Sequence, residues 1–199
     1  MHKLLTTLLF VVAIVATSCN GSRSNKSESE TAQADTTAVQ QTSEEPGDRG
    51  YIVAVGDLAP DFTIEVDNGT TFTLSQNRGK VVMLQFTASW CGICRREMPF
   101  IESDIWQRFG SNPDFVLLGV DRDETADKVA MMKEKTEVTY PIAYDVESNA
   151  FTLYAFPDAG ITRNVLIDRD GKIVMLTRRY EEEEFAALCA KIAEMLGEN

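Results

Sequence analysis

The segment VVMLQFTASWCGICRREMPF, residues 81–100, decides the fold. Its apolar beginning, residues 81–86, has the composition of a buried strand. After Cys94, apolar side chains recur at helical spacing and predict a helix over residues 95–109. A Cys-x-x-Cys pair therefore stands between the end of a strand and the start of a helix. Unpaired amides and the helix dipole favour a thiolate at Cys91, and Cys94 follows one turn later, close enough to close a disulfide.

The Cys91–Cys94 pair has two other interpretations. It could be half of a zinc site, but zinc needs about four ligands, and the chain otherwise offers only Cys19, Cys189 and His2 as thiol or imidazole ligands. It could also be a structural disulfide, although so short a loop constrains the unfolded chain little. We therefore predict a redox-active disulfide, with no metal and no other cofactor.

The stretch FTASWCGICRREMP, residues 86–99, resembles the active-site segment of the thioredoxin superfamily, specifically its TlpA/ResA-like bacterial branch. Two further segments, GDLAPDF at 56–62 and VLIDRDGK at 165–172, are similar to the opening of that branch and to one of its strands with the following turn. The resemblance covers residues 55–196. It implies a thioredoxin-like α/β fold: a mixed central sheet with helices on both faces and an N-terminal strand or hairpin extension.

The pattern along the rest of the chain agrees with such a fold. Strand-like and helix-like segments alternate, and a hairpin and a helix close the chain, which predicts a sheet covered on both faces. The expected elements are a hairpin near 62–74, strands at 115–120, near 142, at 165–168 and at 173–177, and helices at 125–135, 147–154 and 181–196. Cys189 shares the apolar face of the last helix, so we expect it in the core.

The resemblance also implies roles within the site. Cys91 is expected to be the nucleophile, and Cys94 the resolving thiol that releases the substrate. Glu97 matches a glutamate that assists proton transfer near the thiols of this branch. As an ordinary first-turn acid it would only complement the helix dipole. Gln85 stands where thioredoxins proper carry a buried aspartate, so a proton relay here must use another group, and Glu97 is our candidate.

Five residues are expected to form the substrate-docking surface: Trp90, Gly92, Ile93, Thr162 and Arg163. A purely structural role for Trp90 stays open. Thr162 aligns with the cis-proline that the family places opposite the two cysteines, so substrate docking here departs from the family pattern. Arg163 is a candidate for recognising an anion or for stabilising a thiolate.

The N-terminal part of the chain predicts export and an anchor. Residues 1–18 combine a short basic start with an apolar run that is too short to span a bilayer and typical of a signal peptide. They lead into Cys19 and resemble a bacterial lipoprotein signal, in which Cys19 becomes lipidated. Ordinary cleavage that leaves Cys19 free is the alternative. Residues 19–49 are polar and predict a disordered linker, and residues 50–199 predict one thioredoxin-like domain.

The charge and the histidine content exclude several functions. A net charge of −12 does not favour binding to nucleic acid or to an anionic membrane surface. Loss of His2, the only histidine, with the signal peptide would exclude Ser-His-Asp and Cys-His nucleophiles and histidine metal sites. The expected partners are client protein thiols or disulfides and a membrane electron donor, and we expect a monomer.

These patterns predict an enzyme, a thiol–disulfide oxidoreductase that faces the periplasm, is lipid-anchored in the bacterial envelope and acts as a reductase. Two alternatives stay open. A thiol peroxidase would use Cys91 to attack peroxide and Cys94 to resolve the product. Thr162 in place of the proline and the neighbouring Arg163 favour this alternative, because peroxiredoxins place an arginine near this strand. Against it, the Pro-x-x-x-Thr-x-x-Cys motif is absent, because Thr87 lies four residues before Cys91. A non-catalytic binding lipoprotein would hold a partner in the thioredoxin-like groove and carry an inert cysteine pair.

Overall fold

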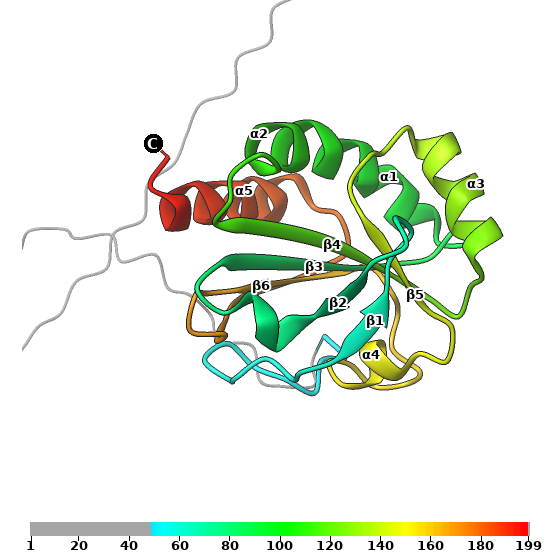
Figure 1. Cartoon of the computed structure of the whole chain (residues 1–199), viewed down its shortest axis with the longest axis horizontal. Helices are drawn as coiled ribbons and strands as arrows, with labels where there is room; N and C mark the ends of the chain where they lie inside the picture. Colours follow the sequence, from blue (N-terminus) through cyan, green and yellow to red (C-terminus); the bar gives the residue numbers. More distant parts are fainter. Residues whose placement is uncertain (1–48, 199) are drawn as a thin grey trace, which may run out of the picture. The chain divides into compact units, whose positions relative to one another are not determined.

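A five-stranded mixed sheet forms the centre of residues 49–198, which this computed structural model describes (Figure 1). The predicted signal peptide, Cys19 and the predicted linker up to residue 48 lie outside the described residues. The strand order is β5-β4-β3-β6-β7, in which β3, β4 and β5 run parallel, β6 is antiparallel to β3, and β7 is antiparallel to β6. The strands are β3 (Val81–Thr87), β4 (Phe115–Arg122), β5 (Ile142–Asp145), β6 (Arg163–Ile167) and β7 (Ile173–Arg178).

Strand β3 is the central strand of the sheet, and both of its faces are covered. All seven of its residues are buried, as its nearly continuous apolar sequence predicts. It pairs with β4 along its whole length and with β6 from Val82 to Phe86. The fold expected from the sequence, a thioredoxin-like mixed sheet with helices on both faces, is confirmed.

Two apolar cores lie on the two faces of this sheet. One contains Met98 and Ile101 from the helix after the cysteines, together with Leu188 from the C-terminal helix. The other contains Phe151 and Tyr154 from the segment around α4. Figure 1 shows α1, α2 and α5 on one side of the sheet, and α4 with the N-terminal hairpin on the other. The helices are α1 (Gly92–Phe100), α2 (Gln107–Phe109), α3 (Ala126–Thr136), α4 (Asn149–Thr152) and α5 (Glu182–Leu196).

The helix predicted at 95–109 is one continuous helical segment with a wider middle. A π-helical stretch, η2 (Ile101–Trp106), joins α1 to α2. Pro99 lies inside α1, just before this stretch, and it has no amide hydrogen to donate within the helix.

The expected N-terminal hairpin is present beside the sheet. Strands β1 (Thr63–Glu65) and β2 (Thr71–Thr73) pair antiparallel, and a short 3-10 turn, η1 (Leu74–Asn77), follows. The hairpin continues onto the main sheet through a bridge between Val66 and Ala143 of β5. It therefore covers part of an otherwise open sheet edge.

The chain is fastened to the domain from its first described residue. Arg49 forms an ion pair with Glu184 of α5 at 2.7 Å. The buried Tyr51 donates a hydrogen bond from its hydroxyl to the Thr177 carbonyl at 2.6 Å, and the Ile52 amide bonds the carbonyl of Tyr154 at 3.0 Å. Arg49, which the sequence assigns to the end of the linker, thus contacts the folded domain.

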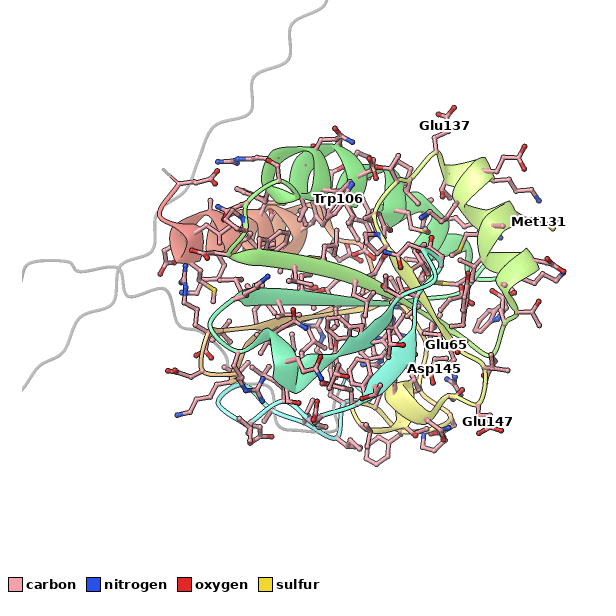
Figure 2. The ribbon with its side chains drawn as sticks, viewed as in Figure 1. Glu65, Trp106, Met131, Glu137, Asp145 and Glu147 are labelled. Atoms are coloured by element: carbon pink, nitrogen blue, oxygen red, sulfur yellow. A yellow bond between two sulfur atoms is a disulfide. The ribbon has the colours of Figure 1, made fainter. Side chains whose placement is uncertain are left out.

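Two local expectations differ from the structure. The helix expected at 147–154 is shorter in the structure and comprises only α4. It begins at Asn149 because Ser148 adopts a left-handed conformation with φ of 57°. Asp145 then accepts the amides of Ala150 and Phe151 and fixes where α4 begins (Figure 2). Cys189 is half-buried against the core and not fully inside it. Burial still raises the pKa of its thiol to about 11.

Candidate active site

The two cysteines lie at the start of α1, just after the loop that follows β3. Cys91 is the N-cap residue of α1, and its Sγ accepts the backbone amide of Cys94 at 3.2 Å. A disulfide joins the two residues, whose Cα atoms are 5.3 Å apart. Cys91 is 9% exposed and Cys94 is 0% exposed. Of the two sulfurs, Cys91 is therefore the one that a client can reach, and it lies at the positive end of the helix dipole.

The loop before Cys91 is held from two sides. Ser89 donates its hydroxyl to Glu124 Oε1 at 2.6 Å and its backbone amide to the other oxygen of the same carboxylate. Arg95 donates from its guanidinium to the Ser89 carbonyl. These contacts fix the loop between β3 and α1, so the approach to Cys91 is preorganised.

Sequence reasoning did not identify Glu124 as a residue of the site. The signal that could have found it is topological: Glu124 follows β4, and β4 lies next to β3 and parallel to it. The carboxyl ends of neighbouring parallel strands meet at one edge of a sheet. A side chain just after β4 therefore lies near the loop that leaves β3.

Behind the sulfurs lies a buried carboxyl with unusual proton affinity. Glu97 is 1% exposed and shares the helix face of Cys94, three residues away. The Asn164 amide donates to Glu97 Oε1 at 2.7 Å. Burial raises the pKa of Glu97 to about 7, although the amides of Asn164 and Gln85 act in the opposite direction. A carboxyl with this pKa can hold or release a proton near neutral pH, which general acid–base catalysis requires.

The network around Glu97 extends across the sheet. The Tyr140 hydroxyl donates to Gln85 Oε1 at 2.7 Å, and the Asn164 amide also bonds Thr177 Oγ1 at 2.9 Å. Among the described residues, Glu97 Oε2 and Gln85 Nε2 have no hydrogen-bond partner. Gln85 pairs with Asn164 in the register of β3 and β6, so it lies near the Glu97 carboxyl, although no hydrogen bond joins the two side chains and an amide cannot act as an acid.

Four of the five residues expected at the docking surface surround the sulfurs. Trp90 is 60% exposed, Gly92 is exposed and Ile93 is partly buried. The side chain of Thr162 is buried, and its hydroxyl lies 3.1 Å from both Cys91 Sγ and Cys94 Sγ. Thr162 can therefore influence the sulfurs directly, whereas Trp90 and Gly92 form the outer surface.

Arg163, the fifth residue, lies on the other side of β6. Neighbouring residues of a strand point to opposite faces, so Asn164 reaches Glu97 while Arg163 points away. Arg163 is 1% exposed, its guanidinium lies 4.4 Å from the centre of the Tyr51 ring, and its Nε donates to the Gly160 carbonyl at 2.9 Å. This corrects the expectation from the sequence: the geometry does not bring Arg163 to an anion or to a sulfur.

Comparison with known proteins places this arrangement in a family. The family model for Redoxin matches residues 54–192. The chain belongs to the Redoxin family. Two curated relatives, the thiol-disulfide oxidoreductases ResA of Geobacillus thermodenitrificans and Geobacillus kaustophilus, are 34% and 33% identical to this Redoxin over 123 residues. Each alignment covers 61% of this chain and 67% of the relative.

Solved structures give the same result. A Bacteroides thetaiotaomicron protein, described as a protein disulfide isomerase, is 62% identical with a TM-score of 0.73, and the match covers 75% of this chain and 94% of that one. A Chlorobium tepidum protein, described as a thiol:disulfide interchange protein DsbE, is 28% identical with a TM-score of 0.64, covering 73% and 99%. With the Cys91–Cys94 disulfide, these matches show that this Redoxin is a thiol–disulfide oxidoreductase that acts by dithiol–disulfide exchange.

A groove of this Redoxin lies on the side of α4. It has a volume of about 570 Å³, and one wall begins at Thr125, directly after the Glu124 that holds the active-site loop. Figure 2 shows Glu65, Asp145 and Glu147 on this side of the molecule. The groove is lined by Phe62, Thr63, Ile64, Glu65, Thr125, Ala126, Tyr144, Asp145, Val146, Glu147, Asn149, Ala150 and Leu153.

Within residues 49–198 of this Redoxin, no three or more His, Cys, Asp or Glu side chains are grouped to hold a metal ion. In the same part of the chain, no helix combines the length and the apolar character needed to cross a membrane.

Proposed function

We propose that this Redoxin is an envelope reductase that transfers two electrons from Cys91 and Cys94 to disulfides of client proteins. The observation that carries the proposal is the asymmetry of the pair: Cys91 is reachable at the start of α1, while Cys94 is fully buried one turn later beside Glu97. This asymmetry supports one sulfur as the attacking atom and the other as the resolving atom.

The first step forms a mixed disulfide. The Cys91 thiolate attacks one sulfur of the client disulfide, a new S–S bond forms, the client S–S bond breaks, and one client thiolate leaves and takes up a proton. The amide of Cys94 and the dipole of α1 stabilise the attacking thiolate. Trp90 and Gly92, exposed next to Cys91, provide the surface on which the client chain lies.

The second step releases the client. The Cys94 thiol gives its proton to the Glu97 carboxylate, and the resulting thiolate attacks Cys91 Sγ. The Cys91–Cys94 bond forms, the mixed disulfide breaks, and the second client thiolate leaves with a proton taken from Glu97 or water. The client gains two electrons and the enzyme loses them. A dithiol donor at the membrane then reduces the enzyme again.

The location in the envelope is part of the same proposal. The apolar run that ends at Cys19 supports export and lipid attachment, and the polar residues that follow would let the domain reach clients away from the membrane. A reductase is useful where disulfides form spontaneously, which is the condition outside the cytoplasm.

Equilibration of the purified protein in glutathione or dithiothreitol buffers tests the direction of electron flow. A reduction potential near that of thioredoxin, about −270 mV, supports a reductase, whereas a value near −120 mV makes the protein an oxidant of client thiols. A pair without a reversible two-electron equilibrium would leave only the non-catalytic binding function. A variant with both Cys91 and Cys94 replaced by serine is the control: any reversible oxidation that remains in it comes from groups other than this pair.

Disulfide isomerisation is the second candidate, because the 62% identical Bacteroides thetaiotaomicron protein is described as a protein disulfide isomerase. Rearrangement of client disulfides needs attack by Cys91 but no net electron transfer. Cys94→Ser therefore distinguishes the two: it retains rearrangement of a scrambled client but abolishes net reduction. The thiol peroxidase alternative loses the support of Arg163, because its side chain is buried against the Tyr51 ring.

A further inference from the structure

One hydroxyl group lies within hydrogen-bond distance of both reactive sulfurs. Thr162 Oγ1 is 3.1 Å from Cys91 Sγ and 3.1 Å from Cys94 Sγ. Cys91 Sγ has a second donor, the Cys94 amide at 3.2 Å. Because Thr162 and Cys94 are both buried, bulk water does not compete freely for these contacts.

The position of this hydroxyl is fixed by the backbone around it. The Thr162 carbonyl accepts Arg178 Nη1 at 3.1 Å and the Arg179 amide at 3.1 Å. The next residue begins β6, which pairs with both β3 and β7. The hydroxyl is therefore held in place before the sulfurs change their redox state, so it needs no reorganisation when charge develops there.

The chemistry of a hydroxyl decides what it can do between two sulfurs. It carries one hydrogen, so it can donate to only one sulfur at a time. In the disulfide both sulfurs are neutral and weak acceptors. After reduction Cys91 carries the negative charge, and a hydrogen bond to a charged acceptor is roughly twice as strong as a neutral one. The hydroxyl thus stabilises the reduced form more than the oxidised form.

We propose that Thr162 is a catalytic residue whose hydroxyl donates to the Cys91 thiolate in the dithiol and turns to Cys94 when that sulfur becomes the attacking thiolate. The inference rests on the proposed thiol exchange and adds to it a residue that serves both steps. In the mixed disulfide Cys91 is neutral, so the hydroxyl is free to stabilise the Cys94 thiolate that forms when the proton moves to Glu97. No electrons pass through Thr162, and it keeps its own proton.

Two substitutions at this position separate the hydroxyl from the shape of the side chain. Thr162→Val removes the hydroxyl and keeps the branched shape, and Thr162→Ser keeps the hydroxyl. Thr136→Val is the matched control, because the buried hydroxyl of Thr136 bonds the carbonyl of Met132, away from the sulfurs. The full chain is reduced, and the alkylation rate of Cys91 by iodoacetamide is followed against pH by peptide mass spectrometry.

Thr162→Val should move the alkylation midpoint of Cys91 upward by about one pH unit, so that the rate below the midpoint falls about tenfold. The reduction potential should fall by about 30 mV, which is the same tenfold change for a two-electron couple. Release of client from the mixed disulfide should slow about tenfold as well. Thr136→Val should match the wild-type protein in all three measurements, and Thr162→Ser should lie closer to the wild-type values than Thr162→Val does.

An unchanged midpoint, potential and release rate in folded Thr162→Val would overturn the role of Thr162 while leaving thiol exchange intact. Wild-type protein that exchanges no thiols would instead overturn the proposed function itself. If Thr162→Val does not fold, Thr162→Ala removes the same hydroxyl. The comparison of Thr162→Ala with Thr162→Ser then decides: equal alkylation midpoints reject the proposal, and a higher midpoint for alanine supports it.

Discussion

Two neighbouring residues of β6, Arg163 and Asn164, are both buried and polar, yet they belong to different parts of the molecule. Asn164 bonds Glu97 behind the sulfurs, whereas Arg163 lies against Tyr51 on the opposite face. Along one strand, alternate side chains thus reach the buried Glu97 on one face and the N-terminal segment at Tyr51 on the other. Changes on the Asn164 face should therefore alter exchange rates, and changes on the Arg163 face should alter stability.

The largest effect on the exchange rate is expected for Glu97→Gln, on the Asn164 face of β6. The amide keeps the shape and a hydrogen-bond acceptor for Asn164, but it cannot take the proton of Cys94. The rate of client release at pH 7 should fall about 100-fold, the lower end of the usual contribution of a general acid or base. Stopped-flow reduction of a model disulfide would measure it. An unchanged release rate would show that Glu97 has only a structural role and does not take the proton of Cys94.

The same carboxyl should make stability depend on pH. Burial raises the pKa of Glu97 from its ordinary 4.5 to about 7, so the folded protein keeps a proton that the unfolded chain has already lost. The free energy of unfolding should therefore decrease as the pH rises from about 4.5 to about 7, by up to about 3 kcal/mol, and then level off.

Urea denaturation of wild-type protein and Glu97→Gln across this range isolates the contribution of Glu97. Asp121, whose pKa burial raises to about 8, contributes to both proteins and is removed by the comparison. The difference in the free energy of unfolding should grow between pH 4.5 and 7 in favour of the variant. A constant difference would mean that Glu97 titrates at its ordinary value.

The opposite face should respond in stability alone. Arg163→Ala leaves a cavity beneath Tyr51 and removes the cation–π contact, so we expect a loss of about 2 kcal/mol in the free energy of unfolding. The exchange rate of the folded variant should stay within about twofold of wild type, since the contacts of the Arg163 side chain within residues 49–198 are with Tyr51 and Gly160 and not with Cys91 or Cys94. Arg163→Met, which fills most of the same volume without a charge, should recover much of the stability.

The smallest effect is expected where the N-terminal segment crosses Arg163. A Cβ at Gly50 would lie 2.7 Å from Arg163 Nη2, and the glycine has φ of +78°. Gly50→Ala should lower the free energy of unfolding by about 1 kcal/mol, because both the contact and the backbone conformation disfavour a side chain. Thermal unfolding measures it, with Gly197→Ala as control: Gly197 has a similar φ but open space around it.

The sequence could have predicted that Arg163 and Asn164 point to opposite faces of β6, but only if the start of this strand had been placed at Arg163. Local pattern predicts the strand at 165–168, whereas pairing of Arg163 with Phe86 extends it to Arg163. Once the strand includes Arg163 and Asn164, alternation places them on opposite faces. The boundary is set by a partner strand 77 positions earlier in the chain (163 minus 86) and not by local propensity, so a local reading treats these residues as loop.

Other parts were predictable because their signal is local. The apolar run of β3 and the Cys-x-x-Cys pair fix the strand, the turn and the helix start within twenty residues. Glu97 could be proposed from the resemblance, but its raised pKa depends on burial by the whole sheet. The hydrogen bond between Glu124 and Ser89 and the short length of α4 could not be predicted locally, because both depend on which side chains the tertiary structure brings together.

The half-buried Cys189 has a consequence for an enzyme whose work is to exchange thiols. A third thiol of ordinary reactivity could attack the Cys91–Cys94 bond of its own molecule and form a wrong internal disulfide, or attack that of a neighbour and form a disulfide-linked dimer. Since the pKa of Cys189 is raised to about 11, only about one molecule in 10,000 carries its thiolate at pH 7. Partial burial on α5 thus keeps Cys189 largely protonated and unreactive, so the enzyme can carry a third cysteine without attacking its own active-site disulfide.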